Sequence, residues 1–419
     1  MEYCVENYLP YRLHMIKTKK FKTVSVKVIF STTVKKEEIT IRNFLADILT
    51  YSTSKYKTHK EMTIALQDLY AMNIFSNCYR IGKFYNTDIS ASFLNEKYTE
   101  EGMFEKSIKT LSEIIFNPNV TNKEFDGSSF DIIKRMSFNQ IEGIKENTRK
   151  LSLIKMLENM GKDEIYSYHS FGYIDDLDKI TPSNLYTAYK NLLEKSKIDI
   201  FVLGDIDFNV TQKIIEENFK FNTLKKKKEE FIIYHNKFRK TPKKIKEEFK
   251  ISQSKLSIGC KIGNINDFDR NYVLPLYSII LGGGSDSKLF KEVREKNSLC
   301  YYISASANKL DSILFITSGI SSNNFDKTVK LTKKAMKDMK KGDFTEDDIE
   351  KAKIQYITML EELKENPFQI ISSYYSMEML NYESIEEREK KIMAVNHEQI
   401  KELSSKIYID TIYLLKGAE

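Results

Sequence analysis

The sequence is poor in cysteine, histidine, proline and tryptophan. Of 419 residues, four are cysteine, five are histidine, six are proline and none is tryptophan. The cysteines, Cys4, Cys78, Cys260 and Cys300, are far apart and form no CxxC pair. This excludes a disulfide-rich secreted domain and a four-cysteine zinc site, and we expect four reduced thiols in a cytoplasmic protein. A Cys4–Cys78 disulfide is the one alternative that stays open.

Long apolar runs are also absent. No stretch of about 18 apolar residues occurs, so no segment is expected to span a membrane. The net charge of +7, from 66 basic and 59 acidic residues, is mild for this length. Much of the excess lies in residues 225–246, where Phe231, Tyr234 and Phe238 stand among lysines. Acidic residues and a proline in the same run favour a solvated linker over a nucleic-acid surface, so no nucleic-acid partner is expected.

The same succession of predicted strands and helices occurs twice along the chain. Alternating or short apolar runs predict strands at 23–30, 87–94, 198–203, 255–261, 312–320 and 412–415. Helical periodicity falls between them, as in residues 104–115 and 325–340. Lys145-Glu146-Asn147 recurs as Lys364-Glu365-Asn366, and the helix start at Thr181 is echoed at Asn396.

This ordered self-similarity indicates an internal duplication. The predicted fold class is α+β: two homologous halves, each an antiparallel sheet with helices packed on one face. The predicted boundaries are a first domain at 1–220, a charged linker at 221–248 and a second domain at 249–419.

The most specific motif is Leu281–Ser304, LGGGSDSKLFKEVREKNSLCYYIS. It resembles the glycine-rich loop and following helix of the insulinase-like (M16) zinc peptidases, which have the form LGGGxxSRLFxxVREKxGLAYxV. Segments 116–118 (FNP) and 202–205 (VLGD) match the family in the expected order. The stretches FKTVSVKVIF and QDLYAMNI are most similar to a non-catalytic bacterial branch, the YfmF-like proteins, described as associated with aminopentanol modification of elongation factor P. The resemblance covers nearly the whole chain and implies two M16 domains of the LuxS/metallohydrolase-like type.

Active members of this family carry HxxEH on a helix of the first half. Two histidines four residues apart share a helix face and hold zinc, and the glutamate activates the bound water. The resemblance aligns the histidines with Asn43 and Asp47 and the glutamate with Ala46. The further glutamate ligand falls near Asn139 or Gln140, neither of which is a carboxylate. The resemblance therefore implies a degenerate motif, no metal and no cofactor in this chain, and zinc only on a partner subunit.

The histidines offer no ligand pair elsewhere. No two of them lie within ten residues, and His397-Glu398, which begins like HExxH, has Lys401 in place of the second histidine. We interpret His397 as a structural residue at a helix start. Ligands distant in sequence could still converge, so a standalone peptidase with an unconventional metal site stays an alternative.

The second half retains Arg294 and Tyr301, which match the Arg and Tyr of the family's REKxGLAY segment. In active complexes this pair resembles a clamp that hydrogen-bonds the substrate and helps to stabilise the oxyanion. The structural alternative is that Arg294 pairs with Glu292 or Glu295 and that Tyr301 belongs to the core. Tyr302 takes the role of Tyr301 if the alignment shifts by one residue.

Gly282, Gly283 and Gly284 match the family's glycine-rich loop. In the non-catalytic subunit of the mitochondrial processing peptidase, a family relative, this loop contacts the substrate. A glycine run after a helix is equally typical of a helix C-terminus.

These features predict a non-catalytic, pseudo-peptidase subunit of an M16-type zinc peptidase. It would pair with a zinc-bearing homologue as a heterodimer and contribute Arg294 and Tyr301 to bind a peptide or small-protein substrate. The alternative is a non-enzymatic scaffold or a peptide-binding homodimer of the same fold.

Overall fold

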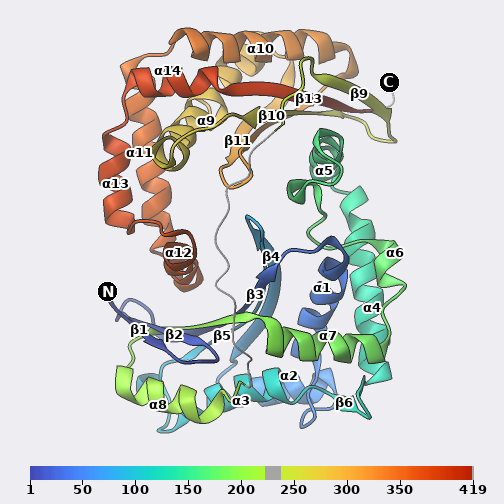
Figure 1. The fold of residues 1–419 in the computed structure, drawn as a ribbon, viewed down its shortest axis with the longest axis vertical. Helices are drawn as coiled ribbons and strands as arrows, with labels where there is room; N and C mark the ends of the chain where they lie inside the picture. Colours follow the sequence, from blue (N-terminus) through green and yellow to red (C-terminus); the bar gives the residue numbers. More distant parts are fainter. Residues whose placement is uncertain (222–236, 418–419) are drawn as a thin grey trace. The chain divides into compact units, whose positions relative to one another are not determined.

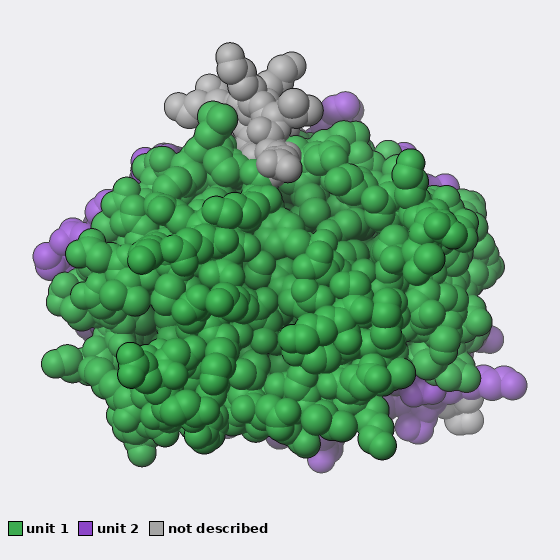
Figure 2. Space-filling model, turned by 90° about the horizontal axis from the view of Figure 1, so that it is seen from below, with its two compact units in different colours: residues 1–142, 169–230, 366–375 green, residues 143–168, 231–365, 376–419 purple. Residues whose placement is uncertain are grey.

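The computed structural model of the chain describes residues 1–221 and 237–417. Residues 222–236, which include most of the predicted linker's first half, lie outside the described residues. The chain divides into two compact units (Figures 1 and 2). Unit 1 comprises residues 1–142, 169–230 and 366–375, and unit 2 comprises residues 143–168, 231–365 and 376–419.

Unit 1 is built on a six-stranded sheet with the strand order β1-β2-β8-β3-β5-β4. Its strands are β1 (Glu2–Asn7), β2 (Arg12–Lys17), β3 (Thr23–Thr33), β4 (Asn73–Ile81), β5 (Phe84–Leu94) and β8 (Lys197–Gly204). Neighbouring strands are antiparallel except β2 and β8, which are parallel. Alternate residues of β3, from Val24 to Phe30, are buried in one core, as their period-2 pattern predicts.

Helices cover the apolar face of this sheet. They are α1 (Lys36–Tyr51), α2 (His59–Gln67), α3 (Met103–Phe116), α4 (Gly127–Glu142), α6 (Ile174–Leu177), α7 (Pro182–Lys195) and α8 (Phe208–Asn218). Short elements complete the unit: η1 (Glu96–Tyr98), β6 (Val120–Thr121) and β7 (Glu124–Phe125). Phe44 of α1, Ile108 of α3 and Leu185 of α7 lie in the same core cluster as β3. The helical spacing of the apolar residues therefore predicted which helix faces would be buried.

Unit 2 contains a five-stranded sheet with the order β11-β12-β10-β13-β9. Its strands are β9 (Lys243–Glu248), β10 (Ser254–Ile262), β11 (Cys300–Asn308), β12 (Ile313–Ile320) and β13 (Ile407–Lys416). Its helices are α5 (Thr148–Met160), α9 (Leu274–Gly282), α10 (Phe325–Lys341), α11 (Glu346–Leu363), α13 (Ile385–Met393) and α14 (His397–Ser405), with π-helical turns η4 (Asp269–Val273) and η5 (Phe290–Glu295). Three further 3-10 turns are η2 (Gly143–Lys145), η3 (Ile165–Ser167) and η6 (Ser322–Asn324). Here too one neighbouring pair, β13 and β9, is parallel.

Each unit includes a helix from the other half of the sequence. Helix α5 packs in unit 2, where Ser152 lies 2.9 Å from Ser257 of β10. The first part of α12 (Pro367–Leu380) belongs to unit 1, where the hydroxyl of Tyr375 donates to Asn86 of β5 at 3.0 Å. These helices cover the sheet face opposite the main helical layer. The periodicity of a helix shows that one of its faces is buried, but not which sheet buries it.

The internal echo of the sequence marks equivalent helix starts. Asn147 caps α5 by accepting from the backbone of Lys150, and Asn366 accepts from Phe368 at the start of α12. Thr181 and Asn396 each form a capping box, at α7 and α14 respectively, and a sheet strand follows each helix. The predicted α+β class with two similar halves is confirmed, with one parallel strand pair in each sheet as the difference.

Candidate functional site

The residues aligned with the zinc motif lie on α1. The amide nitrogen of Asn43 donates to Ile39 O at 2.9 Å, to the Tyr85 hydroxyl at 2.8 Å and to Ser170 O at 3.0 Å. Asn43 is thus held as a hydrogen-bond donor, whereas a metal ligand must present a lone pair. Tyr85 and Ser170 are 42 and 127 residues away in sequence, and no sequence signal identified them.

The other two aligned positions differ from each other. Ala46 is buried, and its methyl group can neither accept a proton nor bind a metal. Asp47 is the one carboxylate, and burial raises its pKa to about 6. The charge of Asp47 also contributes, after burial, to the raised pKa of the Cys78 thiol, which places the two groups near each other.

Replacing Asp47 with asparagine is expected to stabilise the protein above pH 6. The folded-state pKa of about 6 lies above the unfolded value of about 3.9, so stability falls as the pH rises from about 4 to 6 and is then constant. The variant should gain about 1–2 kcal/mol at pH 7.5, allowing for partial solvent screening, and almost nothing at pH 4. Denaturant unfolding at both pH values measures this, with the exposed Asp131→Asn on α4 as a control. An equal effect of Asp47→Asn at both pH values would contradict it.

The helix expected to carry the last zinc ligand is α4. Its buried residues include Phe130, Ile133 and Ile141, whereas Asn139 and Gln140 are exposed. Within residues 1–221 and 237–417, no group of three His, Cys, Asp or Glu side chains is placed to hold a metal ion. Zinc needs imidazole nitrogens, thiolates or carboxylates, and these positions supply amides, one methyl group and one carboxylate. The aligned residues therefore do not fit zinc.

The four described histidines have structural contacts. The Nε2 atom of His14 lies 3.1 Å from the Asp199 carboxylate, and that of His397 lies 3.0 Å from Gly342 O. His59 stacks on Tyr51, and His169 stacks on Tyr173. The prediction that His397 is structural, at the first residue of α14, agrees with these contacts. His235 lies outside the described residues.

Arg294, at the end of η5, is exposed. Its guanidinium lies 4.7 Å from the ring centroid of Phe290. Of the two predicted alternative partners, Glu292 is instead 3.4 Å from Lys296 and 3.2 Å from Lys334, and neither Glu292 nor Glu295 pairs with Arg294 among the described residues. In the part of the chain that the structure describes, Arg294 has no ion pair, so its N–H donors are available to an external acceptor.

Tyr301 and Tyr302 lie at the start of β11 and differ in environment. Tyr301 is 77% exposed, which excludes the core alternative. The register between β11 and β12 shifts between Cys300 and Tyr302, so Tyr301 is the extra residue of a β-bulge. Tyr302 instead packs under Arg149, whose guanidinium is 4.5 Å from the ring centroid, and its hydroxyl is buried. The exposed phenol is therefore that of Tyr301.

The three glycines at the end of α9 also differ. A Cβ atom on Gly282 would lie 2.5 Å from Ala305 N, and one on Gly283 would lie 2.6 Å from Ile279 Cα. A Cβ atom on Gly284 would meet nothing within 4 Å. Close packing explains Gly282 and Gly283, so only Gly284 is open to an additional role.

Comparison with known proteins identifies the family of this fold. A family model described as "Peptidase M16 inactive domain" matches residues 179–356. Over 410 residues the chain is 30% identical to the Bacillus subtilis protein described as "Probable inactive metalloprotease YmfF", covering 97% of this chain and 96% of that protein. The chain belongs to the M16 peptidase family.

Two solved structures resemble this M16 homologue along its whole length. A conserved protein from Enterococcus faecalis V583 is 25% identical with a TM-score of 0.92, and 99% of each chain is covered. A Pseudomonas fluorescens protein, described as a peptidase M16 inactive domain, is 16% identical with a TM-score of 0.79, covering 100% of this chain and 98% of that one. The chain is a homologue of inactive M16 metalloproteases, in agreement with its degenerate zinc positions. None of the described helices has the length and apolar character needed to cross a membrane.

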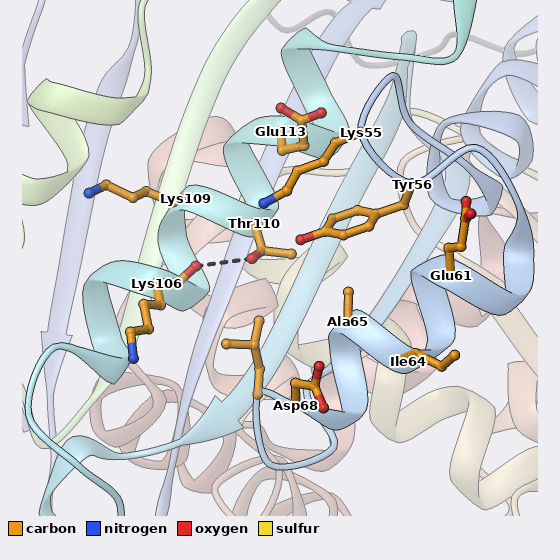
Figure 3. Close-up of a pocket in the computed structure, with 11 residues that line it drawn as sticks. Lys55, Tyr56, Glu61, Ile64, Ala65, Asp68, Lys106, Lys109, Thr110 and Glu113 are labelled. Carbon is orange, nitrogen blue, oxygen red and sulfur yellow. Dashed lines mark hydrogen bonds between the residues drawn. The ribbon is translucent and has the colours of Figure 1, made fainter.

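One pocket of the M16 homologue, of about 640 Å³, is lined by none of the predicted site residues (Figure 3). It lies between α2 and α3. It is lined by Lys55, Tyr56, Glu61, Ile64, Ala65, Asp68, Leu69, Lys106, Lys109, Thr110 and Glu113. Its basic and acidic side chains are mixed, so its charge favours no ligand class.

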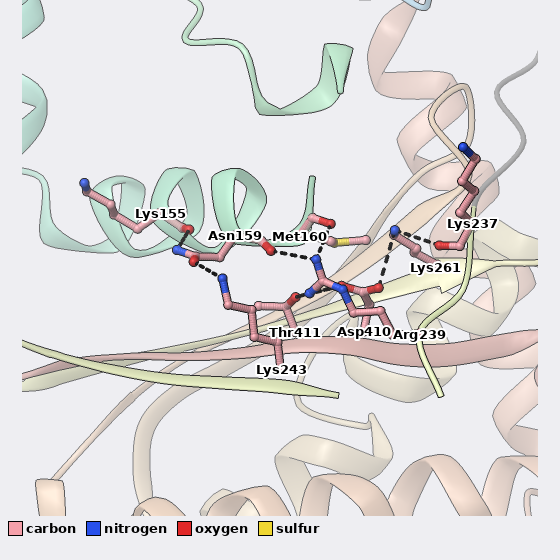
Figure 4. Close-up of polar contacts among 9 residues, drawn as sticks. All are labelled: Lys155, Asn159, Met160, Lys237, Arg239, Lys243, Lys261, Asp410 and Thr411. Carbon is pink, nitrogen blue, oxygen red and sulfur yellow. Dashed lines mark hydrogen bonds and ion pairs between the residues drawn. The ribbon is translucent and has the colours of Figure 1, made fainter. Parts of the chain in front are cut away.

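The end of the predicted linker is part of unit 2 (Figure 4). Arg239 forms an ion pair with Asp410 at 3.3 Å and donates to Thr411 of β13 at 3.2 Å. Lys243 donates to Asn159 of α5 at 2.7 Å. Lys243 also begins β9, so the linker predicted at 221–248 is wrong for 243–248. The sequence of β9, KKIKEE, lacks apolar alternation because the strand is a largely exposed edge.

Proposed function

We propose that this chain is the non-catalytic subunit of an M16-type zinc peptidase and that it supplies Arg294 and Tyr301 to substrate bound near the zinc of a partner subunit. The partner is a zinc-bearing M16 homologue, and the substrate is a peptide or small protein. The chain itself takes no zinc in this proposal. We place the complex in the cytoplasm, because all four cysteines are free thiols.

The observation that carries the proposal is the exposure of Tyr301 on a β-bulge. A tyrosine that served only packing would bury its ring, and this one is 77% exposed. Bulges are enriched beside functional sites because they re-aim a side chain. Arg294, seven residues earlier in the sequence, is exposed as well and has no ion pair among the described residues. A phenol and a guanidinium together supply neutral and charged donors to a carbonyl or an oxyanion.

The strand that carries Tyr301 also suits an extended peptide. In the sheet of unit 2, β11 stands at one end of the strand order. An edge strand has backbone N–H and C=O groups that can pair with an added strand. A peptide paired with β11 would run beside Tyr301, which supports a role in substrate binding.

The test mixes the purified chain with a zinc-bearing M16 homologue and measures hydrolysis of a fluorogenic peptide. We expect the mixture to be active and Arg294→Ala and Tyr301→Phe each to lower its rate by about a hundredfold or more, as for loss of one donor to the reacting oxyanion. Lys296→Ala and Tyr408→Phe, which change an exposed cation and an exposed phenol elsewhere in unit 2, should leave the rate unchanged. Unchanged activity of both Arg294→Ala and Tyr301→Phe would refute the clamp.

A second candidate is a non-enzymatic scaffold or peptide-binding homodimer. It is supported by the packing of Asn43, whose amide donates to Tyr85, and of Gly282, where a Cβ atom would meet Ala305. If the zinc-bearing homologue is as active alone as in the mixture, and the chain elutes as a dimer by itself, the scaffold is the better description.

A further inference from the structure

Lys309 differs from the buried lysines of this protein. Three of those have a carboxylate at ion-pair distance: Lys27 with Asp88 at 3.1 Å, Lys261 with Asp410 at 3.4 Å and Lys353 with Glu350 at 2.8 Å. Within the described residues no ion pair to Lys309 is present, although its side chain is only partly exposed. An ammonium group in such a place loses hydration without gaining a carboxylate at ion-pair distance.

The contacts of Lys309 hold its amine in one position. The residue is in the turn between β11 and β12, where Asn308 Oδ1 accepts from the backbone N–H of Leu310 and Asp311. The Nζ atom lies 4.0 Å from the ring centroid of Tyr382 and donates to Asn271 Oδ1 at 3.3 Å. The contacts of the amine are thus a ring face and a neutral amide oxygen, and neither carries a negative charge.

Nearby charges favour the neutral amine. Burial first, and then the charge of Arg388, lower the pKa of Lys309 to about 7, and Arg270 acts in the same direction. Glu383 opposes this shift, but its carboxylate already accepts from the hydroxyl of Tyr272 at 2.7 Å.

The other charged side chains near Lys309 form hydrogen bonds or ion pairs with other residues. Lys391 hydrogen-bonds to Glu383, and Arg270 pairs with Asp267 at 2.6 Å. Arg388 donates to the hydroxyl of Tyr356 at 3.1 Å. The hydroxyl of Tyr382 has no hydrogen-bond partner among the described residues and is a donor available to a new acceptor.

We propose that Lys309 is a nucleophilic lysine that is acylated by anionic acyl donors of the acyl phosphate class. A lysine in an apolar setting beside another cation is the arrangement that makes an amine nucleophilic at neutral pH. Arg388 forms no ion pair among the described residues, so its guanidinium attracts a donor whose leaving group is a phosphate. This site is independent of Arg294, Tyr301 and the partner subunit.

The reaction transfers one acyl group. The lone pair of Nζ attacks the acyl carbon, the N–C bond forms, and the C–O bond to phosphate breaks with its electrons leaving on the phosphate. The amine proton passes to solvent. The products are an Nε-acyl-lysine and inorganic phosphate, and the amide oxygen can accept from the hydroxyl of Tyr382.

The test measures acetylation of each lysine by peptide mass spectrometry after limited reaction with acetyl phosphate or with trace acetic anhydride, from pH 6 to 10. At pH 7 about half of Lys309 is neutral, against well under 1% of an ordinary lysine, so we expect Lys309 to react at least roughly tenfold faster than Lys351. Lys351 is a suitable reference because its hydrogen bond to Asp347 raises its pKa. The preference for Lys309 should be larger with acetyl phosphate than with the uncharged anhydride.

Two variants separate reactivity from accessibility. Lys309→Arg should remove the fast site and leave the other lysines unchanged. Arg388→Met should slow Lys309 at pH 7 but not at pH 10, where the amine is neutral in either protein. If Lys309 reacts no faster than Lys351 with both reagents, the proposal is overturned. If it is fast with the anhydride alone, the preference for anionic donors is wrong.

Discussion

Replacing Asp199 with alanine is expected to destabilise unit 1 by about 3–5 kcal/mol, the usual effect of removing one partner of a buried ion pair. Asp199 lies on β8 and is fully buried. Its Oδ1 atom accepts from Arg12 Nε at 2.7 Å and from His14 Nε2 at 3.1 Å, while the hydroxyl of Tyr3 lies 2.8 Å from His14 Nδ1. Because a carboxylate only accepts, His14 carries its proton on Nε2 and Tyr3 donates to Nδ1. Loss of Asp199 removes the carboxylate that accepts the hydrogen bonds from His14 and Arg12.

The same cluster predicts how the stability depends on pH. Burial alone would raise the pKa of Asp199, but the hydrogen bond from His14 and the charges of Lys197 and Arg12 outweigh it and hold the pKa well below its usual range. Since the folded value lies below the unfolded value, the stabilisation is complete at neutral pH and is lost as the pH falls below about 4. The difference in the free energy of unfolding between the wild-type protein and Asp199→Ala should therefore become smaller in acid.

Denaturant unfolding between pH 3 and 8 measures both effects. The matched control is Glu105→Ala on α3, which removes a largely exposed ion pair in which Glu105 lies 2.6 Å from Lys109. This substitution should change the free energy of unfolding by less than about 0.5 kcal/mol. If Asp199→Ala costs no more than Glu105→Ala at pH 7, the cluster does not stabilise the fold.

Helices and strands could be predicted where the residues within the element itself form a recognisable pattern. The alternation in β3 and the apolar stripe of α3 reflect burial of one face, and residues within each element show it. The acidic first turn of α11 is likewise a local pattern, and Thr345 caps this helix with Asp348 in a capping box. In contrast, β9 is a mostly exposed, charged edge strand, so its residues carry no such pattern.

For the candidate site, the sequence could predict which residue types stand at the aligned positions but not which residues they contact. Asn43, Ala46 and Asp47 show from their residue types alone that the two imidazoles and the glutamate of the family's HxxEH motif are replaced. That Asn43 is bound by Tyr85 and Ser170 depends on contacts between distant segments, which no local pattern records. The bulge that exposes Tyr301 adds one residue to β11, and only the pairing with β12 reveals it. Lys309 was missed because a lysine beside an asparagine at a turn has no unusual sequence pattern.

Gly282→Ala is expected to destabilise unit 2 by about 1–3 kcal/mol, the range for overpacking of a well-packed site. In an exposed helix the same change would stabilise by up to about 1 kcal/mol, because alanine loses less backbone entropy. At Gly282 the new methyl group would lie 2.5 Å from Ala305 N and 2.7 Å from Ala305 Cβ, and the backbone of β11 cannot yield without breaking its pairing with β12.

The matched control for this clash is Gly284→Ala, two residues beyond the end of α9. Its methyl group meets nothing within 4 Å, and its backbone is not in the left-handed region, so stability should change by less than about 0.5 kcal/mol. Thermal unfolding of the two variants decides the issue. Equal effects would contradict the packing explanation of the glycine run. The expected contrast assigns Gly282 to the contact between α9 and β11 and leaves Gly284 as the one glycine of the three where a methyl group could block substrate without harming the fold.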